Sequence, residues 1–111
     1  MATDAKGIIG QALGLAEIIG YQEGSVVSRT LIDKKIGTIT VFAFGEGQGL
    51  SEHTAPFDAF VQILDGAAEV TISGTPHRVA AGEFIIMPAN EPHALKADRG
   101  PFKMLLVMIR A

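Results

Sequence analysis

The feature that most constrains this sequence is a series of short runs rich in β-branched and aromatic residues, separated by turn residues. The runs recur roughly every 8–12 residues, which is typical of an antiparallel sandwich or small barrel. Helical periodicity is poor after residue 20. Predicted strands do not alternate with helices, so a parallel sheet is disfavoured. We expect strands at residues 25–32, 38–44, 59–65, 68–73, 77–80 and 84–87, another opening at 92–93, and a last one at 102–109.

Composition narrows the class of protein further. A chain of 111 residues, 48% of them apolar and 19% charged, can form one domain with a core and is too apolar for disorder. It has no cysteine, which excludes disulfide scaffolds, thiolate metal sites and cysteine nucleophiles. A net charge of −3 argues against nucleic acid as a partner.

The N-terminal region differs from the rest. Residues 7–20 are apolar but contain four glycines and Glu17, and they are too short to cross a bilayer. We expect a short helix or an irregular arm over residues 1–23, followed by a barrel over residues 24–111. We do not expect the protein to associate with a membrane, and the default location is the cytoplasm.

Two of the predicted strands are apolar at every or nearly every position, so both of their faces are apolar. A strand with only one buried face would need apolar residues at alternate positions only. These are residues 84–87 and 104–109. One face of each fills the barrel, so the other must be covered by a second sheet, by the N-terminal arm or by another subunit. A homodimer is the economical answer.

Two of the three histidines stand in frames of glycine and proline. The joint spacing of these residues is more specific than glycine or proline content alone. The two frames read Gly47-x5-His53-x12-Gly66 and Gly82-x5-Pro88-x-Asn90-x2-His93.

These frames resemble the two signature motifs of the cupin family, over about half of the chain. The resemblance implies an all-β, cupin-type antiparallel barrel of the jelly-roll kind. It also places His53 and His93 at two of the family's four metal-ligand positions. The other two positions fall at Ala55 and Ala59, which cannot bind a metal through their side chains.

The incomplete ligand set decides what the resemblance implies for a cofactor. A catalytic divalent site needs about three protein ligands and an open position. The implied cofactor is therefore one divalent metal (zinc, iron, manganese or nickel) held by an incomplete set, or none. Asp58 is next to Ala59, where the resemblance would place a glutamate ligand, but strand alternation points Asp58 to the opposite face. Glu52 and Glu91 lie near the histidines in loops of unknown direction.

The segment of residues 53–59 is expected to shape a ligand pocket. Pro56 and Phe57 interrupt the strand alternation there, as at the mouth of a small barrel. His77 is expected to be structural or exposed. Arg29 could pair with a carboxylate at a subunit interface or bind an acidic ligand, but a solvent-facing side chain on an outer strand is the expectation. Met87, Met104 and Met108 could line a pocket through adaptable contacts, although such methionines are more often core filler. The pocket residues that we predict are Ala55, Phe57, Ala59, Met87 and Met104.

Three functions stay open at this point, because the cupin fold hosts many activities. The first is a barrel that binds a small molecule, with a degenerate metal site at His53 and His93. The second is a metal-dependent enzyme of the dioxygenase, isomerase or decarboxylase type. The third is a non-catalytic dimer that acts as an interaction module. No serine stands in a Gly-x-Ser-x-Gly motif, so nothing identifies a serine triad.

Overall fold

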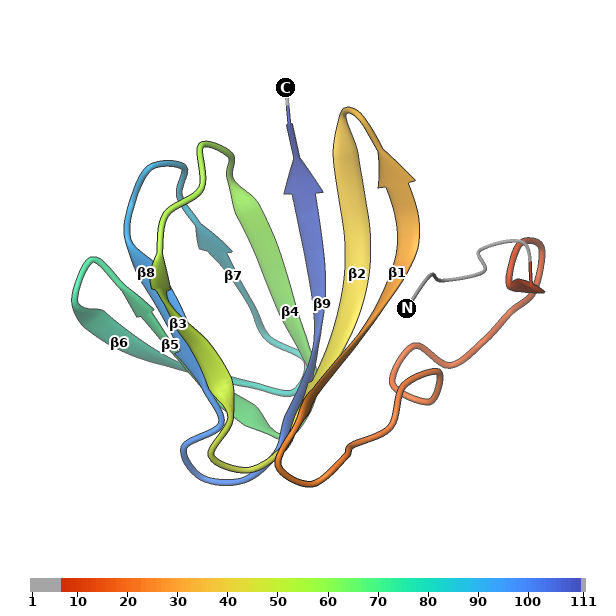
Figure 1. Cartoon of the computed structure of the whole chain (residues 1–111), viewed down its shortest axis with the longest axis horizontal. Coiled ribbons are helices and arrows are strands. Elements are labelled where there is room, and N and C mark those ends of the chain that lie inside the picture. The colour runs from red at the N-terminus through yellow and green to blue at the C-terminus, as the bar shows by residue number, and fades with distance from the viewer. Residues whose placement is uncertain (1–6, 111) are drawn as a thin grey trace.

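A computed structural model describes residues 7–110 and places nine β-strands there, arranged in two facing sheets (Figure 1). The strands are β1 (Val26–Lys34), β2 (Gly37–Phe44), β3 (Gly49–His53), β4 (Ala59–Asp65), β5 (Ala67–Ile72), β6 (Thr75–Ala80), β7 (Phe84–Met87), β8 (His93–Lys96) and β9 (Phe102–Ile109).

The larger sheet has the order β1-β2-β9-β4-β7 and the smaller one the order β3-β8-β5-β6, with antiparallel pairing throughout. Consecutive strands are often not neighbours, as in a jelly roll. The two sheets meet at the bottom of Figure 1 and diverge toward its top. The all-β jelly roll expected from the sequence is therefore confirmed.

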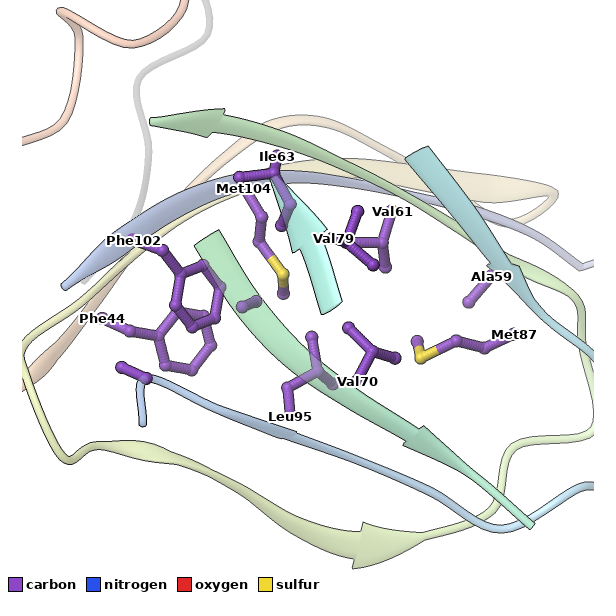
Figure 2. Close-up of a cluster of buried hydrophobic side chains, with 12 residues drawn as sticks. Phe44, Ala59, Val61, Ile63, Val70, Val79, Met87, Leu95, Phe102 and Met104 are labelled. Atoms are coloured by element: carbon purple, nitrogen blue, oxygen red, sulfur yellow. The ribbon is translucent and has the colours of Figure 1, made fainter. Parts of the chain in front are cut away.

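The core lies between the two sheets and is made of alternate residues from each strand. On β4, Ala59, Val61 and Ile63 are almost fully buried, whereas the residues between them are partly exposed. Near the end where the sheets meet, the rings of Phe44 and Phe102 stack at 4.5 Å between centroids. Figure 2 shows this cluster, whose buried members are Phe44, Ala59, Val61, Ile63, Ala68, Val70, Val79, Met87, Leu95, Ala97, Phe102 and Met104.

One strand, β3, has no counterpart among the predicted strands. Four of its five residues are exposed, so it lacks the alternating burial that would identify a strand. It forms because it pairs with β8. Gly49 is required at its start, since a Cβ atom there would lie only 2.3 Å from the carbonyl oxygen of Leu95.

Residues 7–25 form an irregular arm with no α-helix, and the arm packs on the outer face of the larger sheet. Ile19, only 6% exposed, contacts the cluster that contains Val41 and Ala43 of β2. The side chain of Arg29 donates to the carbonyl oxygen of Ile18 at 3.3 Å, so it does not simply face solvent as expected. The arm therefore covers part of an outer face that the sequence leaves apolar.

The boundary predicted between residues 23 and 24 stays a prediction, although β1 begins close to it, at Val26. Residues 1–6 of the predicted arm lie outside the described residues. Within residues 7–110, no helix is long and apolar enough to cross a membrane.

Candidate functional site

The structure brings the two framed histidines together. His53 ends β3 and His93 begins β8, and the two residues are direct partners in the pairing of these strands. Their Nε2 atoms lie 3.1 Å apart, and their rings meet edge to face at 4.4 Å between centroids. Two residues forty positions apart in the sequence thus form one site.

Backbone carbonyls fix the tautomer of both rings. Nδ1 of His53 lies 2.7 Å from the carbonyl oxygen of Ser51, and Nδ1 of His93 lies 3.2 Å from that of Glu91. A carbonyl oxygen only accepts hydrogen bonds, so each Nδ1 carries a proton. In the neutral rings both Nε2 atoms then present lone pairs, and these lone pairs face each other.

The two rings differ in exposure, and this sets their electrostatics. The side chain of His53 is exposed, whereas His93 is 3% exposed. Burial lowers the pKa of His93 below its ordinary value, and a positive charge on His53 would lower it further. The hydrogen bond to the Glu91 carbonyl opposes both effects. The balance favours a neutral His93 with a free Nε2 lone pair.

The geometry of the pair fits two neighbouring ligands of one metal ion. With metal–nitrogen bonds of about 2.0–2.1 Å, two nitrogens 3.1 Å apart subtend an angle of about 95–100°. This angle is near that of adjacent positions around a six- or four-coordinate ion. Metal-bound histidines also commonly donate their second N–H to a carbonyl, as both rings do here.

Residues 7–110 place no third protein ligand near the pair. Among residues 7–110, no group of three or more histidine or carboxylate side chains is placed to hold a metal. Oδ1 of Asp58 accepts the N–H of Ala89 at 2.8 Å, and Glu91 accepts a hydrogen bond from Ser73. Glu52 is exposed. The site therefore fits the metal in part, with two donors where a resident catalytic ion needs about three.

The predicted pocket residues lie at different depths. Ala55 and Phe57 are partly buried in the segment between β3 and β4. Ala59 and Met87 are strand partners that are buried in the core, at one end of Figure 2. Met104 is also in the core but lies toward the opposite end of that view. The last three residues are thus part of the packed core.

Asn90 of the second frame has a backbone conformation that glycine usually adopts. Asn90 has a φ of 66°, in the left-handed region that glycine adopts freely. Asparagine tolerates this conformation better than other residues with a side chain. The N–H of Asn90 donates to the carbonyl of Ala55 at 2.7 Å, so the two frames are joined beside the histidines.

Comparisons with known proteins now decide the family. The family model described as a cupin domain matches residues 40–108. The chain belongs to the cupin family. A solved structure of a conserved protein of unknown function from Streptococcus pyogenes is 41% identical, with a TM-score of 0.87, over 92% of this chain and 89% of that one. The resemblance inferred from the two frames is confirmed.

Other solved cupins support the same assignment. A cupin 2 conserved barrel domain protein from Leptotrichia buccalis is 42% identical to this cupin, with a TM-score of 0.85 over 87% of it. This cupin spans only 47% of that protein. A cupin superfamily protein from Desulfitobacterium hafniense is 29% identical, with a TM-score of 0.86 over 92% of this chain and 93% of that one. A search of curated proteins returned no match.

Proposed function

We propose that this cupin binds a small molecule beside His53 and His93, with the two imidazoles as its polar anchors. The observation that carries the proposal is the 3.1 Å distance between the two Nε2 atoms. In each ring the other nitrogen, Nδ1, is hydrogen-bonded to a backbone carbonyl. Two lone pairs at this distance repel unless a proton, a cation or a donor group lies at them. The pair is therefore arranged to receive a hydrogen-bond donor or a cation from outside the chain.

The surroundings of the pair add an apolar side to the site. Ile72 is the strand partner of His93 on β5 and is partly buried against the core. Ala55 and Ala59 are small where the family has metal ligands. A mostly apolar molecule with one hydroxyl or ammonium group would match these surfaces.

The alternative is a metal-dependent enzyme, and the angle subtended by the two Nε2 atoms favours it. His53 and His93 would hold a divalent ion, and the ligand or water would fill its other positions. Such an ion polarises a carbonyl or activates oxygen when it is bound. This chain's own residues would bind and orient it through the two fixed imidazole tautomers.

The test is to record histidine-ring nitrogen NMR spectra of chelator-treated protein during two titrations. The first uses Zn²⁺ alone, and the second a set of small alcohols and amines. We expect the Nε2 signals of His53 and His93 to move, while exposed His77 serves as the internal control. A His53→Ala variant should weaken binding about tenfold or more, which corresponds to at least about 1.4 kcal/mol.

The two titrations separate the two functions. A response to the organic probes without metal supports the small-molecule site. A response to the same probes only when Zn²⁺ is present supports the metal-dependent alternative. If neither titration moves the two rings more than His77, both are wrong.

A further inference from the structure

A small pocket lined by charged side chains lies at the smaller sheet, beside the loop that joins β8 to β9. Here called the charged pocket, it has a volume of about 210 Å³. It combines two guanidinium groups, two carboxylates and an imidazole, and its lining residues are Glu69, Pro76, His77, Arg78, Asp98 and Arg99. In Figure 1, β6 lies at the left of the molecule and the arm at the right, so the charged pocket is on the side away from the arm.

The charged pocket is separate from the histidine pair. Glu69 lies on β5 between two fully buried core residues, so its side chain points to the outer face of the smaller sheet. Arg78 is the cross-strand partner of Glu69 on β6 and shares that face. His93 is paired with Ile72 of β5, which packs on the core and so lies on the inner face. A ligand at Glu69 and Arg78 would therefore sit on the opposite face from the histidine pair.

The charges around the pocket do not neutralise one another. The strand register places Glu69 opposite Arg78 on one side and Lys96 on the other, an arrangement in which cross-strand ion pairs form. Within the part of the chain that the structure describes, however, no ion pair or hydrogen bond joins these three side chains, and none joins Asp98 to Arg99. Their donors and acceptors are therefore open to a ligand.

The loop that carries Asp98 and Arg99 is held at both of its ends. Ala97 is fully buried, and backbone hydrogen bonds of 2.8 Å tie both its N–H and its carbonyl to the loop between β2 and β3. At the other end, the carbonyl oxygen of Pro101 lies so close to Gly66 that a Cβ atom there would be 2.4 Å from it. The two charged side chains thus start from a fixed backbone, which reduces the entropy lost when a ligand orders them.

We propose that the charged pocket binds a small zwitterion of the free α-amino acid class. Its carboxylate lies at Arg78 and Arg99, because guanidinium groups donate several N–H groups in one plane and match a carboxylate. Its ammonium group, which only donates, lies at the carboxylates of Glu69 and Asp98, which only accept. A volume of about 210 Å³ is that of about seven water molecules, which suits a short amino acid and is below the size of most ligand pockets.

The balance of charges favours a zwitterion over a simple anion. A phosphate or a simple carboxylate bound at the two guanidinium groups would lie beside two carboxylates of its own sign. A simple cation would meet the guanidinium groups in the same way. A ligand that carries both charges matches all four groups, so Glu69 should contribute to its binding. For a simple anion, by contrast, removing the charge of Glu69 should strengthen binding.

The test is to record histidine-ring NMR spectra of the full chain during separate titrations with L-alanine, acetate, methylamine and inorganic phosphate. The pH and ionic strength are held constant. His77 reports on the charged pocket, which it lines, and His53 and His93 report on the other site. We expect L-alanine to shift the His77 signals to saturation and to leave the histidine pair unmoved. Acetate, methylamine and phosphate should bind about tenfold more weakly or less, because each carries only one sign of charge.

Variants test the assignment of the two charges. Arg78→Gln and Glu69→Gln should each raise the dissociation constant of L-alanine about tenfold or more, since each removes one charge-assisted contact. Lys35→Gln and Glu23→Gln are the matched controls, because each removes one charge of the same sign at an exposed position outside the pocket. Circular dichroism checks that every variant is folded.

The outcomes separate the proposal from its alternatives. Phosphate or acetate binding as tightly as L-alanine overturns it and shows a simple anion site, and so does a Glu69→Gln variant that binds L-alanine no more weakly than the wild type. A protein in which no titrant moves His77, or in which L-alanine moves only the histidine pair, overturns it as well. Saturable L-alanine binding that both pocket variants weaken and both controls keep supports it. This result is independent of whether the histidine pair binds a ligand.

Discussion

The histidine pair shows how much a single buried residue can depend on its neighbours. Among the described residues, His93 is the one buried residue with a polar side chain. Its ring contacts the carbonyl oxygen of Glu91 on one side and Nε2 of His53 on the other. It is neutral because burial and the nearby ring both disfavour its charge. The fold therefore keeps an electron-pair donor at the edge of an apolar core.

The lowered pKa of His93 predicts that acid destabilises the metal-free protein. The unfolded chain takes up a proton near pH 6.5, whereas the folded chain resists it, so stability falls as the pH drops below about 6.5 and levels off below the folded pKa. Urea unfolding at about pH 7.5 and pH 5 measures this loss. His93→Gln should reduce the loss, and His77→Gln should not. An unchanged loss in His93→Gln would show that other groups cause it.

Among the elements, the arm and β3 both take their structure from what they contact. The arm has no regular secondary structure, yet Lys103 of β9 donates to the carbonyl of Ala16 at 2.6 Å and also lies over the ring of Tyr21. Tyr21 in turn donates to the Asp65 carboxylate at 2.5 Å. Burial and this hydrogen bond raise the pKa of Tyr21, so the contact stays formed in neutral solution.

If the arm is part of the folded unit, shortening its buried side chain should destabilise the whole domain. Ile19→Ala should cost about 2–4 kcal/mol, because it leaves a cavity against Val41 and Ala43. Ile9→Ala changes the same residue type at a 73% exposed position and should cost less than about 0.5 kcal/mol. Urea unfolding compares the two variants. Equal, small costs would mean that the arm is not part of the cooperative unit.

At the scale of the whole molecule, the core provides the stability of the fold, and the candidate site is not needed for it. Twelve buried apolar residues hold the two sheets together, and the histidine pair lies at their margin. No metal ligand is needed to connect the sheets, since the buried side chains do so. Both histidines lie in the smaller sheet, where β3 and β8 already pair through the backbone. The fold is therefore expected to stand without any bound ion.

Removing metal should leave the protein folded. After dialysis against a chelator, the Tm should change by less than about 1 °C, or roughly 0.2 kcal/mol for a domain of this size. Differential scanning calorimetry before and after dialysis provides the measurement. Unfolding in the chelator, as in proteins with structural zinc, would contradict this view of the core.

The sequence by itself determined the class of fold and singled out the two histidines of the candidate site. Strand-forming runs at short intervals predict an antiparallel barrel, and the spacing around His53 and His93 identifies the family. These signals are local, because β-propensity, turns and motif spacing are all read along the chain. The loss of side-chain ligands at Ala55 and Ala59 is readable in the same way.

Only the tertiary structure decided how these parts meet. The sequence left open whether His53 and His93 approach each other, because their distance depends on the register of β3 with β8. It also missed β3, whose exposed residues show no apolar alternation and which exists through pairing alone. Hydrogen-bonded register is a non-local property, and it is this register that creates the candidate site.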